Sequence, residues 1–362
     1  MHLKKILNKT EFLDEDLFNL LTLNSQDDIN LLKEKSYATM KKYCGEKVYL
    51  RGLIEFSNIC INDCFYCGIR KSNQNLNRYM LSREEIIESA IWCAENGFGS
   101  VVLQSGERND ENFIDFVVNI VSEIKKNTIS ERLPNGLGIT LCIGEQDFNS
   151  YKRLFDAGAH RYLLRIETTK EDLFYQIHPR EQNFQKRLEC LYMLKDIGYQ
   201  VGTGIMIGLP NQTTQDLVND IIFFKKMDID MVGMGPYLVH KDTPMAHLKI
   251  EYEDLKNVNY LLSLKMIAVT RLFLKDVNIA STTALQAMKP FGREAGLSFG
   301  ANVFMPLITP QRYRSDYQLY DGKPCIDDSA EECLDCSVAR INSFGREIGY
   351  DEWGDSRHFS KK

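Results

Sequence analysis

Three cysteines with short spacing are the residues of this chain best suited to chemistry. Cys60, Cys64 and Cys67 stand in the run Cys60-Ile-Asn-Asp-Cys64-Phe-Tyr-Cys67, at spacings of four and three residues. Three thiolates on one loop can hold three corners of a cubic 4Fe–4S cluster, and the fourth iron then has no protein ligand. An open metal position binds a substrate or cofactor, whereas a fully ligated one is structural. The spacing therefore predicts chemistry at this loop.

Two other uses of these thiols compete with the cluster. The pair Cys64-Phe-Tyr-Cys67 taken alone also suits a zinc site or a dithiol switch. Zinc would need a fourth ligand, and the loop offers no nearby histidine. The triplet thus favours the cluster, with zinc and a redox pair as the alternatives.

Eight β-rich runs alternate with helix-like stretches along the chain. The predicted strands are 48–57, 100–105, 138–144, 161–167, 201–208, 231–239, 277–283 and 302–308. The predicted helices are 14–21, 25–43, 82–96, 109–126, 148–157, 184–197, 213–227, 252–274 and 292–297. Eight such units over roughly 260 residues match an α/β fold of the (β/α)8 TIM barrel type, and a doubly wound open sheet is the alternative. The cysteine loop follows strand one, at the barrel end where active sites form.

The chain divides into three predicted parts. Residues 1–47 form an N-terminal helical extension, residues 48–310 the barrel, and residues 311–362 a C-terminal extension that carries further cysteines. The run Gly202–Gly208 faintly resembles a dinucleotide-binding fingerprint. Its third glycine is misplaced, and it is still strand where a helix should open, so we reject that interpretation.

Composition restricts the classes of partner and the cellular compartment that we expect for this chain. The 362 residues carry a net charge of −6 with no basic patch, so nucleic acid and anionic membranes are poor partners. No signal peptide and no apolar run long enough to span a bilayer is found, which predicts a cytoplasmic protein. In that compartment ten cysteines favour metal or redox roles over disulfides.

Polar residues at later strand ends add candidate binding groups. Glu107 follows the second strand, Glu167 ends the fourth, and Arg187 begins the next predicted helix. An ionised carboxylate accepts hydrogen bonds from a ribose hydroxyl or an ammonium group, and arginine binds carboxylates through two parallel hydrogen bonds. The plainer interpretations are an acid at a helix N-terminus for Glu107 and a solvated helix face for Arg187.

The pattern Cys-x3-Cys-x-aromatic-Cys, with Tyr66 in the aromatic place, resembles the signature of the radical SAM enzymes. The resemblance implies that the open iron binds S-adenosylmethionine (SAM), which the reduced cluster cleaves to methionine and a 5′-deoxyadenosyl radical. A carbon radical needs a site closed to water. By the same resemblance, the SAM-binding residues are Tyr66, Gln104, Ser105, Gly106, Glu107, Thr140, Glu167 and Arg187.

Longer segments resemble a narrower group, the HydE-type maturases of FeFe-hydrogenase. The similar segments are 51–60, 102–107, 161–165, 231–236, 240–244, 282–284, 300–306 and 317–325. The resemblance covers the chain from about Leu32 to Gly354. It departs at Ile166, where the family has a histidine between the arginine and glutamate of strand four.

This narrower resemblance implies a substrate and partners. The substrate would be a small organometallic molecule, a cysteine-bound iron–carbonyl–cyanide precursor made by a second maturase. Other hydrogenase maturation proteins and a low-potential electron donor would be the partners. The implied cavity residues are Gln104, Thr140, Arg165, Thr282, Thr283, Tyr317 and Tyr320. Arg165 can neutralise an anionic complex or its cysteine carboxylate.

A second cysteine group lies near the C-terminus. Cys325, Cys333 and Cys336 form the pattern Cys-x7-Cys-x2-Cys. By resemblance they bind an accessory iron–sulfur cluster, either 2Fe–2S or 4Fe–4S. The cysteines given no function are Cys44, Cys93, Cys142 and Cys190, because buried cysteine behaves as a small apolar residue.

Two alternatives to the maturase remain. The first is another radical SAM enzyme with an amino-acid-derived or alkyl substrate, of the biotin synthase or methylornithine synthase type. Biotin synthase holds a second cluster inside its barrel, which is disfavoured here because only Cys142 lies on a core strand beside Arg165. The second alternative is a non-catalytic iron–sulfur electron carrier, which would have no need for Glu107, Glu167 and Arg187.

Overall fold

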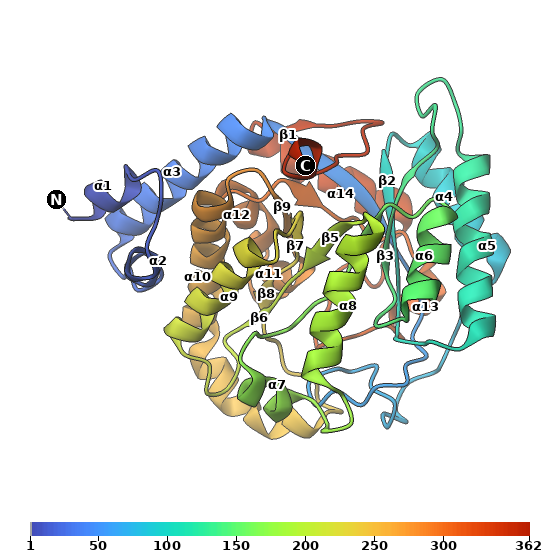
Figure 1. The fold of residues 1–362 in the computed structure, drawn as a ribbon, viewed down its shortest axis with the longest axis horizontal. Helices are drawn as coiled ribbons and strands as arrows, with labels where there is room; N and C mark the ends of the chain where they lie inside the picture. The colour runs from blue at the N-terminus through green and yellow to red at the C-terminus, as the bar shows by residue number, and fades with distance from the viewer. Residues whose placement is uncertain (1) are drawn as a thin grey trace.

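A closed barrel of parallel strands forms the centre of the molecule (Figure 1). The computed structural model describes residues 2–362. The barrel strands are β1 (Lys47–Ser57), β2 (Ser100–Ser105), β3 (Gly138–Cys142), β4 (Arg161–Leu163), β5 (Gln200–Thr203), β7 (Met231–Val232), β9 (Asn278–Ser281) and β10 (Val303–Phe304). They follow one another in chain order, and β10 pairs with β1 to close the ring. The predicted (β/α)8 barrel is therefore confirmed, and the open sheet is excluded.

Several predicted strands end earlier than expected, among them the fourth and the seventh. The fourth stops at Leu163, because Glu167 at the end of the run has a left-handed φ of 64°. The seventh predicted strand, which is β9, stops at Ser281, because Thr283 opens the short helix α11 (Thr283–Met288). The runs after β5 and β7 continue as β6 (Met206–Ile207) and β8 (Gly235–Pro236), which pair with each other.

Helices surround the barrel on its outside. They include α4 (Arg83–Glu95), α5 (Glu111–Asn127), α6 (Phe148–Asp156), α8 (Phe184–Ile197), α9 (Thr214–Lys226), α10 (Lys249–Leu274) and α12 (Gly292–Ser298). Their apolar residues join those on the outer faces of the strands in one large core. Helix α4 begins with a capping box, since Ser82 Oγ accepts from the Glu85 amide at 3.2 Å and the Glu85 carboxylate accepts from the Ser82 amide at 2.8 Å.

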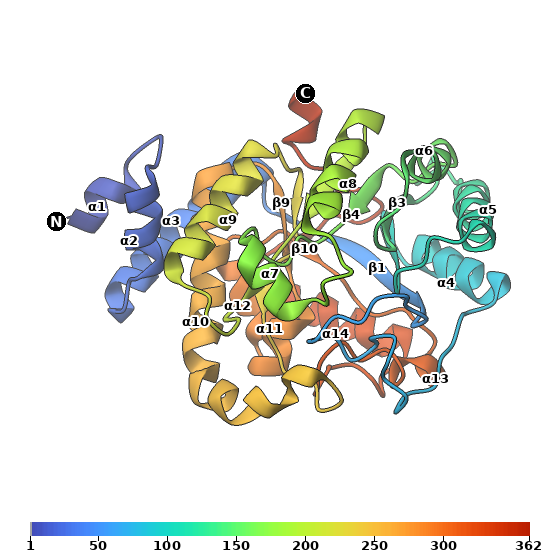
Figure 2. The same cartoon turned by 60° about the horizontal axis from the view of Figure 1, so that its bottom comes forward.

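The N-terminal helices lie beside α9 and α10. These are α1 (His2–Leu7), α2 (Asp14–Leu21) and α3 (Gln26–Cys44), drawn in blue at the left of Figures 1 and 2. Met1, the first residue of the predicted extension, lies outside the described residues. The division at residues 47 and 310 stays a proposal.

The C-terminal segment closes the N-terminal end of the barrel. Strand β11 (Glu347–Ile348) pairs with the start of β1. Beyond it, the Trp353 carbonyl accepts from Arg161 at 2.8 Å and the Gly354 carbonyl accepts from Arg51 at 3.0 Å. Figure 2 places the chain terminus at the top and helices α13 (Gln311–Arg314) and α14 (Ala330–Ser343) at the bottom. The barrel is thus plugged at one end, and the other end carries the loops described next.

The short elements that were not predicted are α1, α7 (Glu171–Ile177), α11, the 3-10 helix η1 (Pro244–Leu248), α13, β11 and a last 3-10 turn η2 (Phe359–Lys361). Helix α14 was also missed. Within residues 2–362, no helix is long and apolar enough to cross a bilayer.

Candidate active site

The cysteine loop leaves β1 at the open end of the barrel and is fixed by polar side chains. Arg78 donates to the carbonyl oxygens of Asn58 at 2.6 Å and Ile69 at 2.8 Å, bridging the two ends of the loop. The Asn58 side chain accepts from the Tyr79 amide at 2.8 Å and donates to the Asp316 carbonyl at 2.7 Å. The loop is therefore tied both to itself and to the C-terminal segment.

The three predicted cysteines of the loop lie together. The Cys60 sulfur accepts from the backbone amides of Asn62 and Glu107, each at 3.4 Å, and the Cys64 thiol lies 3.4 Å from Gln182 Oε1. Burial raises the pKa of Cys64 to about 12, and the nearby Cys60 adds to the rise. Burial, then Cys64 and Cys60, hold the pKa of Cys67 well above its ordinary value. Three thiols that oppose one another's ionisation are suited to a cation that replaces their protons.

The segment after β2 lies directly against this loop. The Gly106 amide donates to the Ser57 carbonyl and the Ile61 amide to the Glu107 carbonyl, both at 2.9 Å. A Cβ atom on Gly106 would stand 2.4 Å from the Ile59 carbonyl oxygen and 2.8 Å from Cys60 Cβ. Only glycine fits this approach. The Ser105 hydroxyl donates to the Gly106 carbonyl at 2.7 Å.

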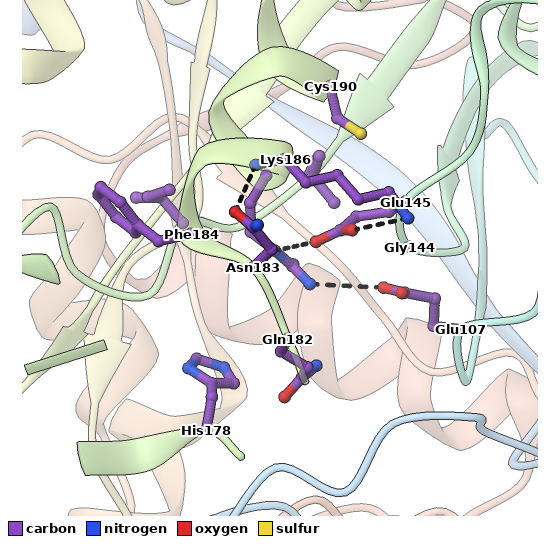
Figure 3. Close-up of polar contacts among 12 residues, drawn as sticks. Glu107, Gly144, Glu145, His178, Gln182, Asn183, Phe184, Lys186 and Cys190 are labelled. Carbon is purple, nitrogen blue, oxygen red and sulfur yellow. Dashed lines mark hydrogen bonds and ion pairs between the residues drawn. The ribbon is translucent and has the colours of Figure 1, made fainter. Parts of the chain in front are cut away.

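Arg187 joins three strand ends beside the cysteines. Its Nε donates to Glu145 Oε1 at 2.8 Å, its Nη1 donates to the Arg165 carbonyl at 3.1 Å, and its Nη2 lies 3.5 Å from Glu107 Oε2. Figure 3 shows Glu107 and Glu145 converging on the start of α8, where Asn183 caps the helix. Gly144 leaves room for the Glu107 side chain, since a Cβ there would stand 2.1 Å from Glu107 Cγ.

The charges in this group are balanced by pairing. Burial raises the pKa of Glu107, while the Arg187 guanidinium lowers it in part. Burial lowers the pKa of Arg187, but Glu107 and Glu145 together raise it above its ordinary value. Arg187 is therefore a fixed cation, and the plainer alternative of a solvated helix face is excluded because its side chain is only 10% exposed.

Glu167 occupies a strained position next to Tyr66. Its φ of 64° places a non-glycine residue in the left-handed region, and its backbone pairs with β6 through the Met206 amide at 3.0 Å. Arg165 Nη2 lies 3.0 Å from Glu167 Oε2 and donates to the Ile205 carbonyl at 3.0 Å. Burial, followed by the Glu167 carboxylate, holds the pKa of Tyr66 well above its ordinary value. Glu167 and the cysteine loop therefore face each other.

His178 supports Tyr66 from the short helix α7. Tyr66 Oη lies 3.3 Å from His178 Nε2, and the rings meet edge to face at 5.4 Å. The other ring nitrogen, Nδ1, lies 3.0 Å from the Phe174 carbonyl oxygen. Burial, with a smaller effect of Arg187, lowers the pKa of His178 to about 3, so the ring is neutral and can accept from Tyr66.

The predicted cavity residues line the inner wall in smaller groups. Gln104 Nε2 donates to Tyr317 Oη at 3.2 Å, and the hydroxyls of Thr283 and Tyr320 lie 3.0 Å apart. Thr282 Oγ1 lies 3.5 Å from the Met234 carbonyl, at the limit of a hydrogen bond. Thr140 Oγ1 is buried and has no hydrogen-bond partner among the described residues. An unpartnered buried hydroxyl indicates a ligand position in the cavity.

Comparison with known proteins decides the family. Residues 54–224 match the model of the radical SAM superfamily. The chain is 42% identical over 354 residues to the [FeFe] hydrogenase maturase subunit HydE of Thermotoga maritima, covering 98% of this chain and 97% of the relative. The chain is a member of the HydE family of radical SAM enzymes.

More distant relatives share the fold. A 3-methylornithine synthase of Methanosarcina acetivorans is 28% identical, covering 84% of this chain and 82% of the relative. The crystal structure of methylornithine synthase (PylB) superimposes with a TM-score of 0.79 at 24% identity, over 96% and 97% of the two chains. At 24% identity, the match to the PylB crystal structure is informative about the fold alone.

The donor set fits the cofactors of the radical SAM superfamily, a 4Fe–4S cluster and SAM. Cys60, Cys64 and Cys67 offer three thiols on one loop that favour a bound cation, as described above. Beside them lie a fixed cation, Arg187, and the buried carboxyl groups of Glu107 and Glu167. These groups complement an amino acid's carboxylate and ammonium group.

The structure adds residues that sequence reasoning missed. Glu145 contacts Arg187, Gln182 contacts Cys64, and His178 contacts Tyr66. Glu145 follows β3 directly. Glu107 and Glu167 were predicted because they follow or end their strands, so the same signal could have predicted Glu145. Ile166, where the sequence departs from the family, is fully buried in the large apolar core.

Proposed function

We propose that the chain cleaves SAM reductively and acts in the assembly of the di-iron active site of FeFe-hydrogenase. Its substrate is a cysteine-bound iron–carbonyl–cyanide precursor. The observation that carries the proposal is the 42% identity to the Thermotoga maturase across 98% of the chain. Identity over this length includes the strand ends and the C-terminal segment that build the cavity, and not the cysteine loop alone.

The residues around the cysteine loop hold the cofactors. Cys60, Cys64 and Cys67 would each bind one iron, and the bound, reduced cluster supplies the electron that breaks a C–S bond of SAM to give a 5′-deoxyadenosyl radical. The Arg187 guanidinium binds the SAM carboxylate. Glu145 fixes the orientation of that guanidinium through the 2.8 Å bond to Nε.

Carboxylates and small residues bind the ammonium and ribose groups of SAM. Glu107 and the backbone of Ser105 and Gly106 receive the ammonium group, and Glu167 accepts from a ribose hydroxyl or the same ammonium. Tyr66, held by His178, closes this side of the pocket. The tight contact between Gly106 and Cys60 keeps the ammonium position next to the cluster loop.

Deeper in the barrel, polar groups face the substrate. Arg165 neutralises the anionic complex, and Thr140 donates its unpartnered hydroxyl to a carboxylate or cyanide. The paired residues Gln104 with Tyr317 and Thr283 with Tyr320 shape the wall, with Thr282 beside them. The plug formed by the C-terminal segment keeps water out from the far end.

Finer points remain predictions. The second iron–sulfur cluster, the low-potential electron donor and the other maturation proteins come from the family resemblance. The cytoplasmic location and the lack of a nucleic acid partner come from composition.

Product analysis tests the radical chemistry. Protein reconstituted anaerobically with iron and sulfide, then given dithionite and SAM, should form 5′-deoxyadenosine. Cys64→Ala should form none, whereas Cys190→Ser should behave as the wild type, because Cys190 is buried in α8 and its thiol donates to the Gln146 carbonyl at 3.6 Å, a bond that a serine hydroxyl can also make. No product from a fully loaded and reduced wild-type protein would favour the electron-carrier alternative.

Maturation in vitro tests the substrate. Apo-hydrogenase incubated with the other maturation components should gain activity only when this protein is present. Equal hydrogenase activity without it would reject the maturase function. Turnover of a free amino acid or of an alkyl chain would then place the chain with the methylornithine or biotin synthases.

A further inference from the structure

A buried carboxyl group outside the cysteine-loop site holds the chain just after Glu167. Asp220 lies on α9, and its side chain is fully buried. Its Oδ1 accepts from the Thr169 backbone amide at 2.8 Å and from the Thr169 hydroxyl at 2.6 Å. Thr169 stands two residues after Glu167 in the chain. Asp220 therefore ties α9 to the segment that leaves the barrel wall after β4.

The carboxyl group of Asp220 is only half used by these bonds. Its Oδ2 is buried and has no hydrogen-bond partner among residues 2–362. Burial raises the pKa of Asp220 to about 7, although the two bonds from Thr169 oppose the rise. A buried polar group that is incompletely paired destabilises a fold, so an apolar side chain would serve packing better at this position. The contribution of Asp220 therefore lies in the segment that it holds.

That segment forms one wall of the cysteine-loop site. It runs from Glu167 to His178 and contains α7, drawn in green in Figure 2. At its far end, the Ile177 carbonyl accepts from the Phe65 amide at 2.9 Å, and His178 Nε2 lies 3.3 Å from Tyr66 Oη. Phe65 and Tyr66 stand between two of the cluster-loop cysteines. A shift of α7 would therefore move the cysteine loop as well.

The start of the segment depends on an anchor. Glu167 has a left-handed φ of 64°, a conformation that persists only when the surrounding structure enforces it. Helix α7 is seven residues long and has no side-chain cap at Lys170, so it gains little stability of its own. Lys170 pairs with Asp216 at 3.2 Å, but its side chain is 42% exposed and such pairs are weak. Asp220 supplies the buried anchor.

We propose that Asp220 is a positioning residue for SAM binding, which acts through Thr169 to set Glu167 and α7 against the cysteine loop. The proposal rests on the proposed function, because it takes Glu167 and Tyr66 to face SAM. A displacement of about 1 Å caused by a change far from the chemistry can cost about 100-fold in rate. Since Glu167 is a binding group, its displacement should weaken SAM binding more than it slows the cleavage step.

SAM binding and kinetics test the effect on the cofactor. In the cluster-loaded enzyme, Asp220→Ala should raise the Kd and the KM for SAM about 10-fold and change kcat at saturating SAM less than about 3-fold. Asp220→Asn keeps an oxygen that can accept both bonds from Thr169, so its Kd should lie within about 3-fold of the wild-type value. A wild-type Kd in Asp220→Ala would overturn the proposal.

Asp230→Ala is the matched control. Asp230 is also a buried carboxyl group that accepts from a backbone amide, that of Val201 at 3.0 Å, but Val201 lies near the start of β5, at the plugged end of the barrel. The control should lower the free energy of unfolding, as Asp220→Ala does, and leave the Kd for SAM unchanged. An equal rise in Kd in both variants would show general destabilisation and overturn the positioning role.

Hydrogen exchange of the apoprotein tests the anchor without any cofactor. Backbone amides of residues 167–178 should exchange about 5- to 10-fold faster in Asp220→Ala, whereas Asp230→Ala should keep the wild-type rates in this segment. Thr169→Val loses the hydroxyl donor but keeps the amide, so it should show a smaller increase, and it decides the matter if Asp220→Ala does not fold. Wild-type exchange rates in Thr169→Val and in any folded Asp220→Ala would overturn the proposal. Faster exchange in these variants, together with a wild type that binds no SAM, would reject the proposed function and leave the anchor standing.

Discussion

Lys323 and Glu55 form a buried ion pair that joins the C-terminal segment to β1. The Lys323 Nζ atom lies 2.6 Å from Glu55 Oε1 and 2.5 Å from Oε2, and both side chains are at most 6% exposed. The same ammonium donates to the Tyr317 carbonyl at 2.9 Å and lies 5.1 Å from the centre of the Tyr317 ring. The position of Tyr317 in the cavity thus depends on a charge pair beneath it.

We expect Lys323→Met to lower the free energy of unfolding by about 3–5 kcal/mol, because it leaves the Glu55 carboxylate buried without its cation. Urea unfolding of the anaerobic apoprotein measures this change. The double variant Glu55→Gln/Lys323→Met should regain most of the loss, since no lone charge remains. As a control, Lys152→Met removes the exposed pair with Asp156 and should cost less than about 0.5 kcal/mol. Equal costs for the two lysine variants would contradict a buried pair.

Arg187 gives a second prediction, on SAM use. Arg187→Met removes the cation between Glu107 and Glu145, so SAM cleavage should fall about 10- to 100-fold, in line with about 1.5–3 kcal/mol for hydrogen bonds to charged groups. The loss should appear chiefly as a raised KM for SAM. Arg187→Lys keeps the positive charge but loses the planar guanidinium, so its rate of SAM cleavage should lie between those of the wild type and Arg187→Met.

The control for this variant is Arg180→Met, because Arg180 is exposed only a few residues before α8. Formation of 5′-deoxyadenosine over a range of SAM concentrations measures the effect, with iron content determined in parallel. An Arg187→Met enzyme with wild-type KM and normal iron would show that this guanidinium does not bind the SAM carboxylate.

The periodic elements of the fold were predictable because their signals are local. Six of the eight barrel strands lie within predicted runs, β1 and β5 begin one residue before theirs, and the bounds of α2 and α8 agree to the residue. The helix α7 was missed because it is seven residues long and has no side-chain cap. Helix α14 carries a capping box, Ser329 with Glu332, a local signal that could have predicted its start.

The candidate site was predictable only where residues follow strands. Glu107, Glu167 and Arg187 could be named from position, yet the bond from Arg187 to Glu145 depends on how α8 lies across the end of β3. The glycine run after β5 shows the same limit. Its Gly204 serves close strand packing, since a Cβ there would stand 1.8 Å from the Gly233 carbonyl oxygen. Contacts between elements cannot be predicted from the residue spacing along a single strand.

Gly106 provides a prediction on cluster assembly. Gly106→Ala would place a methyl group against the Ile59 carbonyl and Cys60 Cβ, forcing the cysteine loop to move. We expect reconstituted iron per chain to fall by half or more and SAM cleavage to fall with it. Gly233→Ala is the matched control, because its added Cβ meets only Leu163 at an ordinary 3.6 Å. Full iron loading in Gly106→Ala would show that the loop tolerates the methyl group.

A last prediction concerns His160 at the plugged end of the barrel. Its ring stacks on Trp353 at 4.6 Å between centroids, and Nε2 lies 3.0 Å from Asp355 Oδ1. Burial, followed by the charge of Arg161, lowers the pKa of His160 to about 4, although Asp355 opposes the shift. The His160 imidazole is therefore protonated below about pH 6.5 in the unfolded chain, but only below about pH 4 in the folded chain. The stability that the neutral ring provides is complete above that window and is lost as the pH falls through it.

The slope of stability against pH isolates this histidine. Between pH 6.5 and 5 the unfolding free energy of the wild type should fall by up to about 2 kcal/mol more than that of His160→Gln, at about 1.4 kcal/mol per pH unit. Glutamine keeps a donor for Asp355 but does not titrate. His247→Gln, an exposed control, should keep the wild-type slope. Parallel slopes for the wild type and His160→Gln would mean that the C-terminal segment admits a charged imidazole, so the barrel would not be sealed at this end.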